Sequence, residues 1–161
     1  MTEQSGRIAS INVAPHGGVP KTAVASAEIA TERVVGDKQN NTLNHGGPMR
    51  AVCLYSAERI AALRAEGHPI LAGSVGENLT LSGVDWAVVA PGGRLVFDGG
   101  VEMEVTSYTT PCQKIAAAFS DGDSTRIHQQ LHPGWSRVYA KVITPGVVRQ
   151  GERLKLEEAG R

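Results

Sequence analysis

The sequence predicts a mainly β protein, a twisted and mostly antiparallel β-barrel with two or three short helices. Many short apolar stretches are separated by turn residues, and 19 glycines and 8 prolines are spread along the chain. Strand-like stretches do not alternate with helices of regular length, which argues against a doubly wound parallel sheet and favours a barrel. The 161 residues, 41% of them hydrophobic, suffice for one domain with a core that needs no disulfides. We therefore expect one domain over residues 1–161, with its core in about residues 7–157.

Strands are predicted wherever apolar residues alternate with polar ones or form a short run between turns. Residues 7–13 and 101–107 alternate in this way, which indicates strands with one buried face. Residues 51–55 form an apolar run typical of a buried strand. About six to eight short strands are expected in all, the others within residues 23–35, 71–83, 88–97, 137–143 and 147–156.

Two segments resemble each other. Residues 88–97 and 147–156 each contain two short extended stretches joined at a glycine, which is the pattern of a hairpin or of a barrel corner. The similarity is too brief for a solenoid repeat. It favours a barrel with similar corners, although turn chemistry can converge on the same pattern.

One helix is predicted to begin after Ser56, whose side chain can cap the first turn. Glu58 suits the positive end of the helix dipole, and Gly67 ends the pattern. Residues 115–119 and 125–131 predict two further helical pieces.

Charge and cysteine content exclude several classes of protein. Sixteen basic and sixteen acidic residues balance, so nucleic acid is not an expected partner. Cys53 and Cys112 match no zinc or redox spacing. The polar residues 1–7 do not resemble a signal peptide, and no run approaches the roughly 20 apolar residues that cross a bilayer. A cytoplasmic protein with reduced thiols and no membrane partner is expected.

Cys112 is the main candidate for chemistry. Its segment follows the predicted strand 101–107, Thr110 can cap a following helix, and Pro111 suits the first helical position. Cys112 would then lie in the first turn, where the helix dipole and Lys114 favour a thiolate. A thiolate suits sulfur transfer or transition-metal binding. The local pattern is equally compatible with a buried, inert cysteine, which is the interpretation we prefer for Cys53.

Five motifs in order resemble the MOSC family, named for the C-terminal domain of molybdenum cofactor sulfurases. They cover about residues 7–157 and are His45-Gly46-Gly47-Pro48 with Ala51-Val52, Gly76-Glu77-Asn78-Leu79, Pro111-Cys112-Gln113-Lys114, Gly134-Trp135-Ser136-Arg137-Val138, and Gly146-Val147 with Gly151-Glu152-Arg153-Leu154. At two corners, Gly92-Gly93 and Gly151-Glu152 stand where the family's pattern has glycine-aspartate, which concerns turns rather than chemistry. The chain also ends near its last expected barrel strand, so the extra regions of longer reductase members are not expected in it.

The resemblance implies a β-barrel and a molybdenum cofactor, and no need for pyridoxal phosphate. Cys112 would be the family cysteine that ligates molybdenum or, in some proposals, carries sulfur. Some members reduce N-hydroxylated compounds with electrons from partner redox proteins. Three functions follow from the resemblance: an oxidoreductase component with Cys112 as the molybdenum ligand, a sulfur carrier that uses a Cys112 persulfide, and a non-catalytic module that binds or delivers the cofactor. The partners would be an external electron donor protein or a sulfur donor.

The phosphate of the cofactor requires cationic side chains. Its polar pterin requires amide-type groups and a backbone that can approach it closely. Gly46 and Gly47 can let backbone N–H groups approach an anion, or form a tight turn. His45 can donate a hydrogen bond to the cofactor or be an ordinary loop residue. With no second histidine or carboxylate at ligand spacing, a zinc site is not expected.

Further candidates lie in the later motifs. Asn78 can bind a pterin edge or the local backbone. Lys114 and Arg137 are the first choices for phosphate or oxyanion contacts. Glu77 is expected to brace a loop or pair with an arginine. Weaker candidates are Lys21 and Arg50 as cations and Trp135 as a stacking or packing ring.

Overall fold

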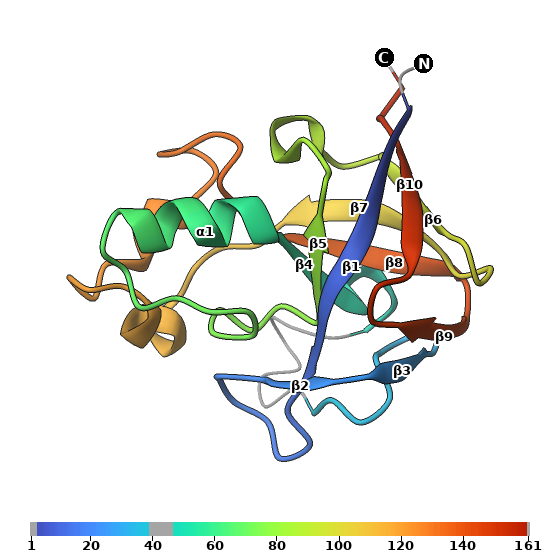
Figure 1. Cartoon of the computed structure of the whole chain (residues 1–161), viewed down its shortest axis with the longest axis horizontal. Coiled ribbons are helices and arrows are strands. Elements are labelled where there is room, and N and C mark those ends of the chain that lie inside the picture. Colours follow the sequence, from blue (N-terminus) through green and yellow to red (C-terminus); the bar gives the residue numbers. More distant parts are fainter. Residues whose placement is uncertain (1–2, 39–46, 161) are drawn as a thin grey trace.

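Seven strands close into a barrel in the computed structural model, which describes residues 3–38 and 47–160 (Figure 1). Neighbouring strands are antiparallel except β4 and β5, which are parallel. The ring closes because β10 pairs with both β6 and β1. The expected mostly antiparallel barrel is confirmed. Its strands, in order around the ring, are β1 (Glu3–Val13), β5 (Leu79–Ser82), β4 (Val52–Ser56), β8 (Val138–Thr144), β7 (Glu102–Tyr108), β6 (Arg94–Phe97) and β10 (Arg153–Glu157).

Three shorter strands lie at the edge of this ring. β2 (Thr22–Val24) pairs with the end of β1, and β3 (Ser26–Ile29) pairs with β9 (Gly146–Arg149) in a separate two-stranded sheet. β1 has 11 residues, long enough to pair with β10 in its first half and with β2 in its second.

The barrel interior is filled by the apolar side chains that alternation places on one face of each strand. In β7, for example, Met103 and Val105 are buried while Glu102 and Glu104 are only half-buried. Large, fully buried side chains from most of the ring strands meet there, among them Ile8, Leu54, Leu81, Leu95, Phe97 and Met103.

The predicted helix is confirmed as α1 (Ala57–Ala65). The Ser56 hydroxyl accepts a hydrogen bond from the Arg59 N–H at 3.1 Å, and Gly67 follows the helix with a φ of 102°. The two later helical pieces are short 3-10 helices, and the second ends at Ile127 rather than at residue 131. Asp123 caps that turn by accepting from the Thr125 N–H. The described 3-10 helices are η1 (Pro48–Arg50), η2 (Trp86–Val88), η3 (Gln113–Ala118) and η4 (Ser124–Ile127).

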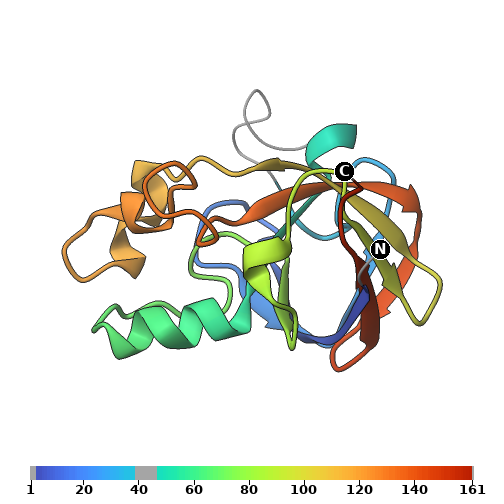
Figure 2. The same cartoon turned by 90° about the horizontal axis from the view of Figure 1, so that it is seen from above.

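The helices α1, η3 and η4 lie together beside one end of the barrel, whereas the two chain ends lie at the other (Figures 1 and 2). In the described part of the chain, no helix has the length and apolar character that crossing a bilayer requires.

Of the two explanations for the similarity of residues 88–97 and 147–156, the structure supports convergent turn chemistry and not similar barrel corners. The later segment forms β9 and β10, which belong to different sheets and do not pair with each other. In the earlier segment only β6 is a strand, because Asp85 accepts from the Ala87 N–H and caps η2 just before it. The shared glycine turns reflect common turn chemistry rather than two equal barrel corners.

Candidate functional site

A pocket of about 650 Å³ opens where the chain leaves β7. Its wall is formed by the end of β7 and the segment after it, by η1, and by Tyr139 of β8. The lining residues are Arg50, Ser107, Tyr108, Thr109, Thr110, Pro111, Cys112, Gln113, Lys114 and Tyr139. The strand and the cysteine motif, predicted from separate patterns, therefore build one site together.

Cys112 is exposed at this pocket and forms no disulfide. Its carbonyl accepts hydrogen bonds from the Ile115 N–H at 3.2 Å and from the Ser124 hydroxyl at 3.3 Å. These bonds hold the backbone of Cys112 against η3 and η4. The thiol is thus presented to the pocket on a fixed backbone.

The expected position of Cys112 within a helix is wrong. Cys112 is itself the N-cap residue of η3, with extended φ and ψ of −133° and 174°, and Thr110 does not cap the helix. A 3-10 helix of six residues also aligns few peptide dipoles. Any activation of this thiol must therefore come from neighbouring charges or from a bound metal.

Two cations line the same pocket. Lys114, a predicted phosphate contact, is exposed two residues after Cys112. Arg50 comes from η1, and its guanidinium carbon lies 6.0 Å from the centroid of the Tyr139 ring. An anionic group in the pocket could therefore be bound by cations from two separate segments of the chain.

Tyr139 contributes a buried phenol to the pocket. Burial raises the pKa of its hydroxyl well above the ordinary value; Cys53 and Cys112 raise it further, and Arg137 and Arg50 oppose the change. The phenol therefore keeps its proton at physiological pH. In the strand register Tyr139 pairs with Cys53 on β4 and with Ser107 on β7.

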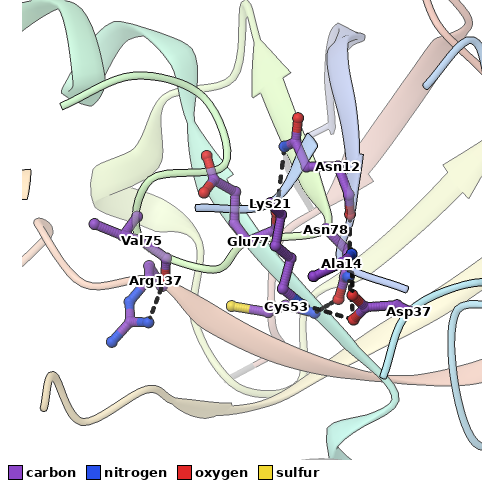
Figure 3. A network of polar contacts seen from close by, with 9 residues as sticks. All are labelled: Asn12, Ala14, Lys21, Asp37, Cys53, Val75, Glu77, Asn78 and Arg137. Carbon is purple, nitrogen blue, oxygen red and sulfur yellow. Dashed lines mark hydrogen bonds and ion pairs between the residues drawn. The ribbon is translucent and has the colours of Figure 1, made fainter. Parts of the chain in front are cut away.

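Asn78 lies outside this pocket, in a buried polar network (Figure 3). Its side-chain oxygen accepts from the Cys53 N–H at 3.0 Å. Its amide nitrogen donates to Asp37 at 2.9 Å and to the Asn12 carbonyl at 3.3 Å. These bonds connect β4 with β1 and the segment containing Asp37, so the side chain braces the barrel wall. Pterin recognition by Asn78 stays a prediction.

Lys21 and Asp37 form a buried ion pair in the same network. The lysine Nζ lies 2.6 Å from the Asp37 Oδ2, and both side chains are at least 95% buried. The other carboxylate oxygen of Asp37 accepts from the Ala14 N–H at 2.8 Å. Lys21 was a weak candidate for an anion contact. Its buried ion pair indicates that it stabilises the fold.

Cys53 lies beside this network and is buried, as its apolar run predicted. Burial raises the pKa of its thiol, with partial opposition from Arg137 and Lys21. The two cysteines thus have opposite environments, one enclosed and one open to the pocket.

Arg137 is buried and does not line the pocket; it lies behind the pocket wall. Its guanidinium donates to the Val75 carbonyl at 2.7 Å and more weakly to the Thr110 carbonyl at 3.5 Å, while its backbone carbonyl accepts from the Thr109 N–H. Arg137 therefore positions two lining residues. A phosphate contact by Arg137 stays a prediction.

Glu77 is also buried, as expected for a bracing residue. One carboxylate oxygen accepts from the Thr80 hydroxyl at 2.9 Å, and the other has no hydrogen-bond partner among the described residues. Burial raises the pKa of this carboxyl.

The first motif is only partly described. His45 and Gly46 lie outside the described residues. Gly47 is exposed with a φ of 81°, a conformation that favours glycine, and it precedes η1. Trp135 packs between two guanidinium groups, with the Arg126 and Arg59 carbons 4.1 and 4.4 Å from its ring, which indicates a structural role.

The tyrosines of the pocket were missed by the sequence patterns. Tyr108 directly follows the predicted strand 101–107 and Tyr139 lies inside the predicted strand 137–143, so neither stood out from its strand. Pairing of β7 with β8 brings both strand ends to the pocket.

A metal in this pocket would have few protein ligands. The described residues contain no cluster of three or more histidine, cysteine, aspartate or glutamate side chains suited to a metal. Among the described residues that line the pocket, Cys112 is the one soft ligand for such a metal, and a cofactor would supply further ligands. The soft thiol, the two cations and the tyrosines are compatible with a metal held on an anionic organic cofactor.

Comparisons with known proteins agree with this architecture. The chain is 31% identical to YflK of Bacillus subtilis over 145 residues, covering 89% of this chain and 64% of YflK. It is 29% identical to YiiM of Escherichia coli, covering 94% of this chain and 69% of YiiM. The crystal structure of YiiM from Geobacillus stearothermophilus matches with a TM-score of 0.73 and 28% identity, over 95% of this chain and 75% of that one. The Bacillus subtilis YUAD protein shares the fold, with a TM-score of 0.76 over 99% of both chains at 16% identity.

This chain spans slightly less than two thirds of the length of YflK. The model of the MOSC domain matches residues 41–155, which include η1, the cysteine segment, five of the seven barrel strands and the start of β10. The chain therefore belongs to the MOSC domain family.

Proposed function

We propose that this chain binds a molybdenum cofactor through the Cys112 thiolate and acts as the oxidoreductase component that reduces N-hydroxylated compounds. The observation that carries the proposal is the single exposed thiol in a polar pocket with Lys114 and Arg50. Family membership and the cysteine motif support it.

The pocket residues suit the parts of such a cofactor. A thiolate is a soft ligand for molybdenum, and the two cations suit a phosphate. Tyr108 and Tyr139 offer aromatic surface next to the thiol. When bound, the cofactor supplies two-electron chemistry at the metal.

The chain's own residues would orient the reactants and donate hydrogen bonds to them. Burial keeps the Tyr139 phenol protonated, so it would act as a hydrogen-bond donor in the pocket rather than give up its proton. Arg137 would act at a distance, by holding the backbone of Thr109 and Thr110 in place. Electrons would come from an external redox protein.

The decisive measurement is the metal content of protein expressed with cofactor supply. We expect about one molybdenum per chain, loss of the metal in Cys112→Ala, and retention in the matched control Cys53→Ala, since one soft ligand decides binding. Equal metal content in Cys112→Ala and the unaltered protein would refute Cys112 as the ligand.

Turnover then tests the reaction. Loaded protein with a chemical reductant should convert an amidoxime to its amidine. Full loading without turnover on any N-hydroxylated substrate would instead support the cofactor-binding module.

A sulfur carrier is the second candidate, and the exposure of the Cys112 thiol is what favours it. A donor persulfide would pass its terminal sulfur to the thiolate of Cys112, releasing the donor thiolate. Mass spectrometry after incubation with a persulfide donor would show the added sulfur on Cys112. Its absence, in protein that binds molybdenum, would exclude the carrier.

A further inference from the structure

A second hollow lies on the outer wall of the barrel, where β1 runs beside β10 near the two chain ends in Figure 1. It has a volume of about 500 Å³ and shares no lining residue with the Cys112 pocket. Its lining residues are Ser5, Gly6, Arg7, Ser82, Gly83, Asp98, Arg153, Leu154 and Lys155.

The hollow exists because small residues form its floor and long basic residues its rim. Ser5 and Gly6 of β1 form this floor together with Ser82 and Gly83 at the end of β5. A β-carbon on Gly6 would come within 2.6 Å of the Ser82 carbonyl oxygen, so the two strands approach too closely there for a side chain. The hydroxyls and backbone of this floor remain accessible between the cations.

Two arginines face each other across the strands. Arg7 of β1 is the register partner of Arg153 of β10, and Lys155 pairs with Ser5, the next outward position. Directly opposed side chains in an antiparallel pair lie about 5 Å apart at their β-carbons, and like charges in that arrangement are unfavourable. Three cations are therefore concentrated around one hollow.

The neighbouring carboxylates neutralise this charge only in part. Asp98 lines the hollow, and Glu3 lies 3.8 Å from the Lys155 Nζ. Among the described residues, neither Arg7 nor Arg153 has a carboxylate within 4.0 Å. Arg7 instead donates to the Gly151 carbonyl at 3.1 Å.

We propose that this hollow is a binding site for a phosphate-type oxyanion, held between Arg7 and Arg153. Guanidinium groups bind such oxyanions with paired hydrogen bonds, and the Ser5 hydroxyl can donate to a remaining oxygen. The Ser82 hydroxyl donates only over 3.5 Å, to the Arg7 carbonyl, and would exchange this long bond for one to the oxyanion. A bound dianion removes the repulsion between the two arginines. The site is independent of the function proposed for Cys112.

Urea unfolding with and without inorganic phosphate, at constant ionic strength set with chloride, tests the site. At phosphate concentrations ten times the dissociation constant, the unfolding equilibrium constant should fall about 11-fold. Arg153→Gln should abolish this fall, whereas the exposed control Arg149→Gln on β9 should retain it. Without phosphate, Arg153→Gln should be at least as stable as the unaltered protein, because it removes a like-charge pair.

Two results would overturn the proposal. One is a phosphate effect no larger than that of chloride, and the other is an equal phosphate effect in Arg153→Gln and in the unaltered protein. Adenosine monophosphate distinguishes the two sources of the phosphate group. Binding at least tenfold tighter than inorganic phosphate assigns the site to a phosphate ester, and equal or weaker binding assigns it to the free ion.

Discussion

Replacement of Asp37 by asparagine tests whether the buried network holds the barrel wall beside the site. Among the described residues, the two carboxylate oxygens of Asp37 accept from Lys21, Asn78 and the Ala14 N–H. An amide has only one accepting oxygen. In either orientation its NH₂ group would point at a donor, and the Lys21 ammonium would be left buried without its counter-ion.

The expected cost is large for one substitution. Removing one partner of a buried ion pair costs about 3–5 kcal/mol. With a urea m-value of about 2 kcal/mol/M for a domain of this size, the midpoint should fall by about 1.5–2.5 M. Asp98→Asn is the matched control, because that carboxylate is exposed and should change stability by less than about 0.5 kcal/mol.

Urea unfolding followed by tryptophan fluorescence and circular dichroism measures both variants. The double-mutant cycle with Lys21→Met adds a second test. Each single variant leaves a buried charge uncompensated and the double variant leaves neither, so the double variant should cost much less than the sum. A cost below about 1 kcal/mol for Asp37→Asn, or simple additivity in the cycle, would refute this account of the network.

Three further predictions follow from the site and its support. Tyr139→Phe should keep its molybdenum but lower kcat up to about tenfold, because it loses one hydrogen-bond donor; an unchanged kcat would exclude the phenol as the donor. Burial raises the pKa of Glu77 in the folded state, so the folded protein binds more protons than the unfolded one and its stability falls as pH rises above the unfolded value near 4.5. Glu77→Gln should remove this fall in unfolding experiments from pH 5 to 8, and equal slopes in the two proteins would contradict it. Gly73→Ala should cost at least about 2–3 kcal/mol, since it places a β-carbon against the Lys21 carbonyl at positive φ. Its control Gly122→Ala has positive φ but open space and should cost about 1 kcal/mol, so equal costs would rule out the clash.

The sequence by itself determined the strands and the one α-helix. Alternation predicted β7 to within one residue at each end and the last seven residues of β1, because burial of one strand face gives the side chains a period of two. The first four residues of β1 were not predicted. The serine cap of α1 is equally local, since Ser56 and Arg59 are three residues apart. The order of the five motifs also identified the family and pointed to Cys112. Motifs can be recognised in the sequence without knowing which strands pair.

Only the tertiary structure decided what surrounds that cysteine. Strand pairing brings Tyr139 to Cys112, and η1 brings Arg50, although these residues lie far apart in the sequence. The fold also makes Asn78 a buried brace, because its side chain forms hydrogen bonds with Cys53 on β4 and with Asp37. These contacts join segments that are distant along the chain, and no local sequence pattern records which strands pair.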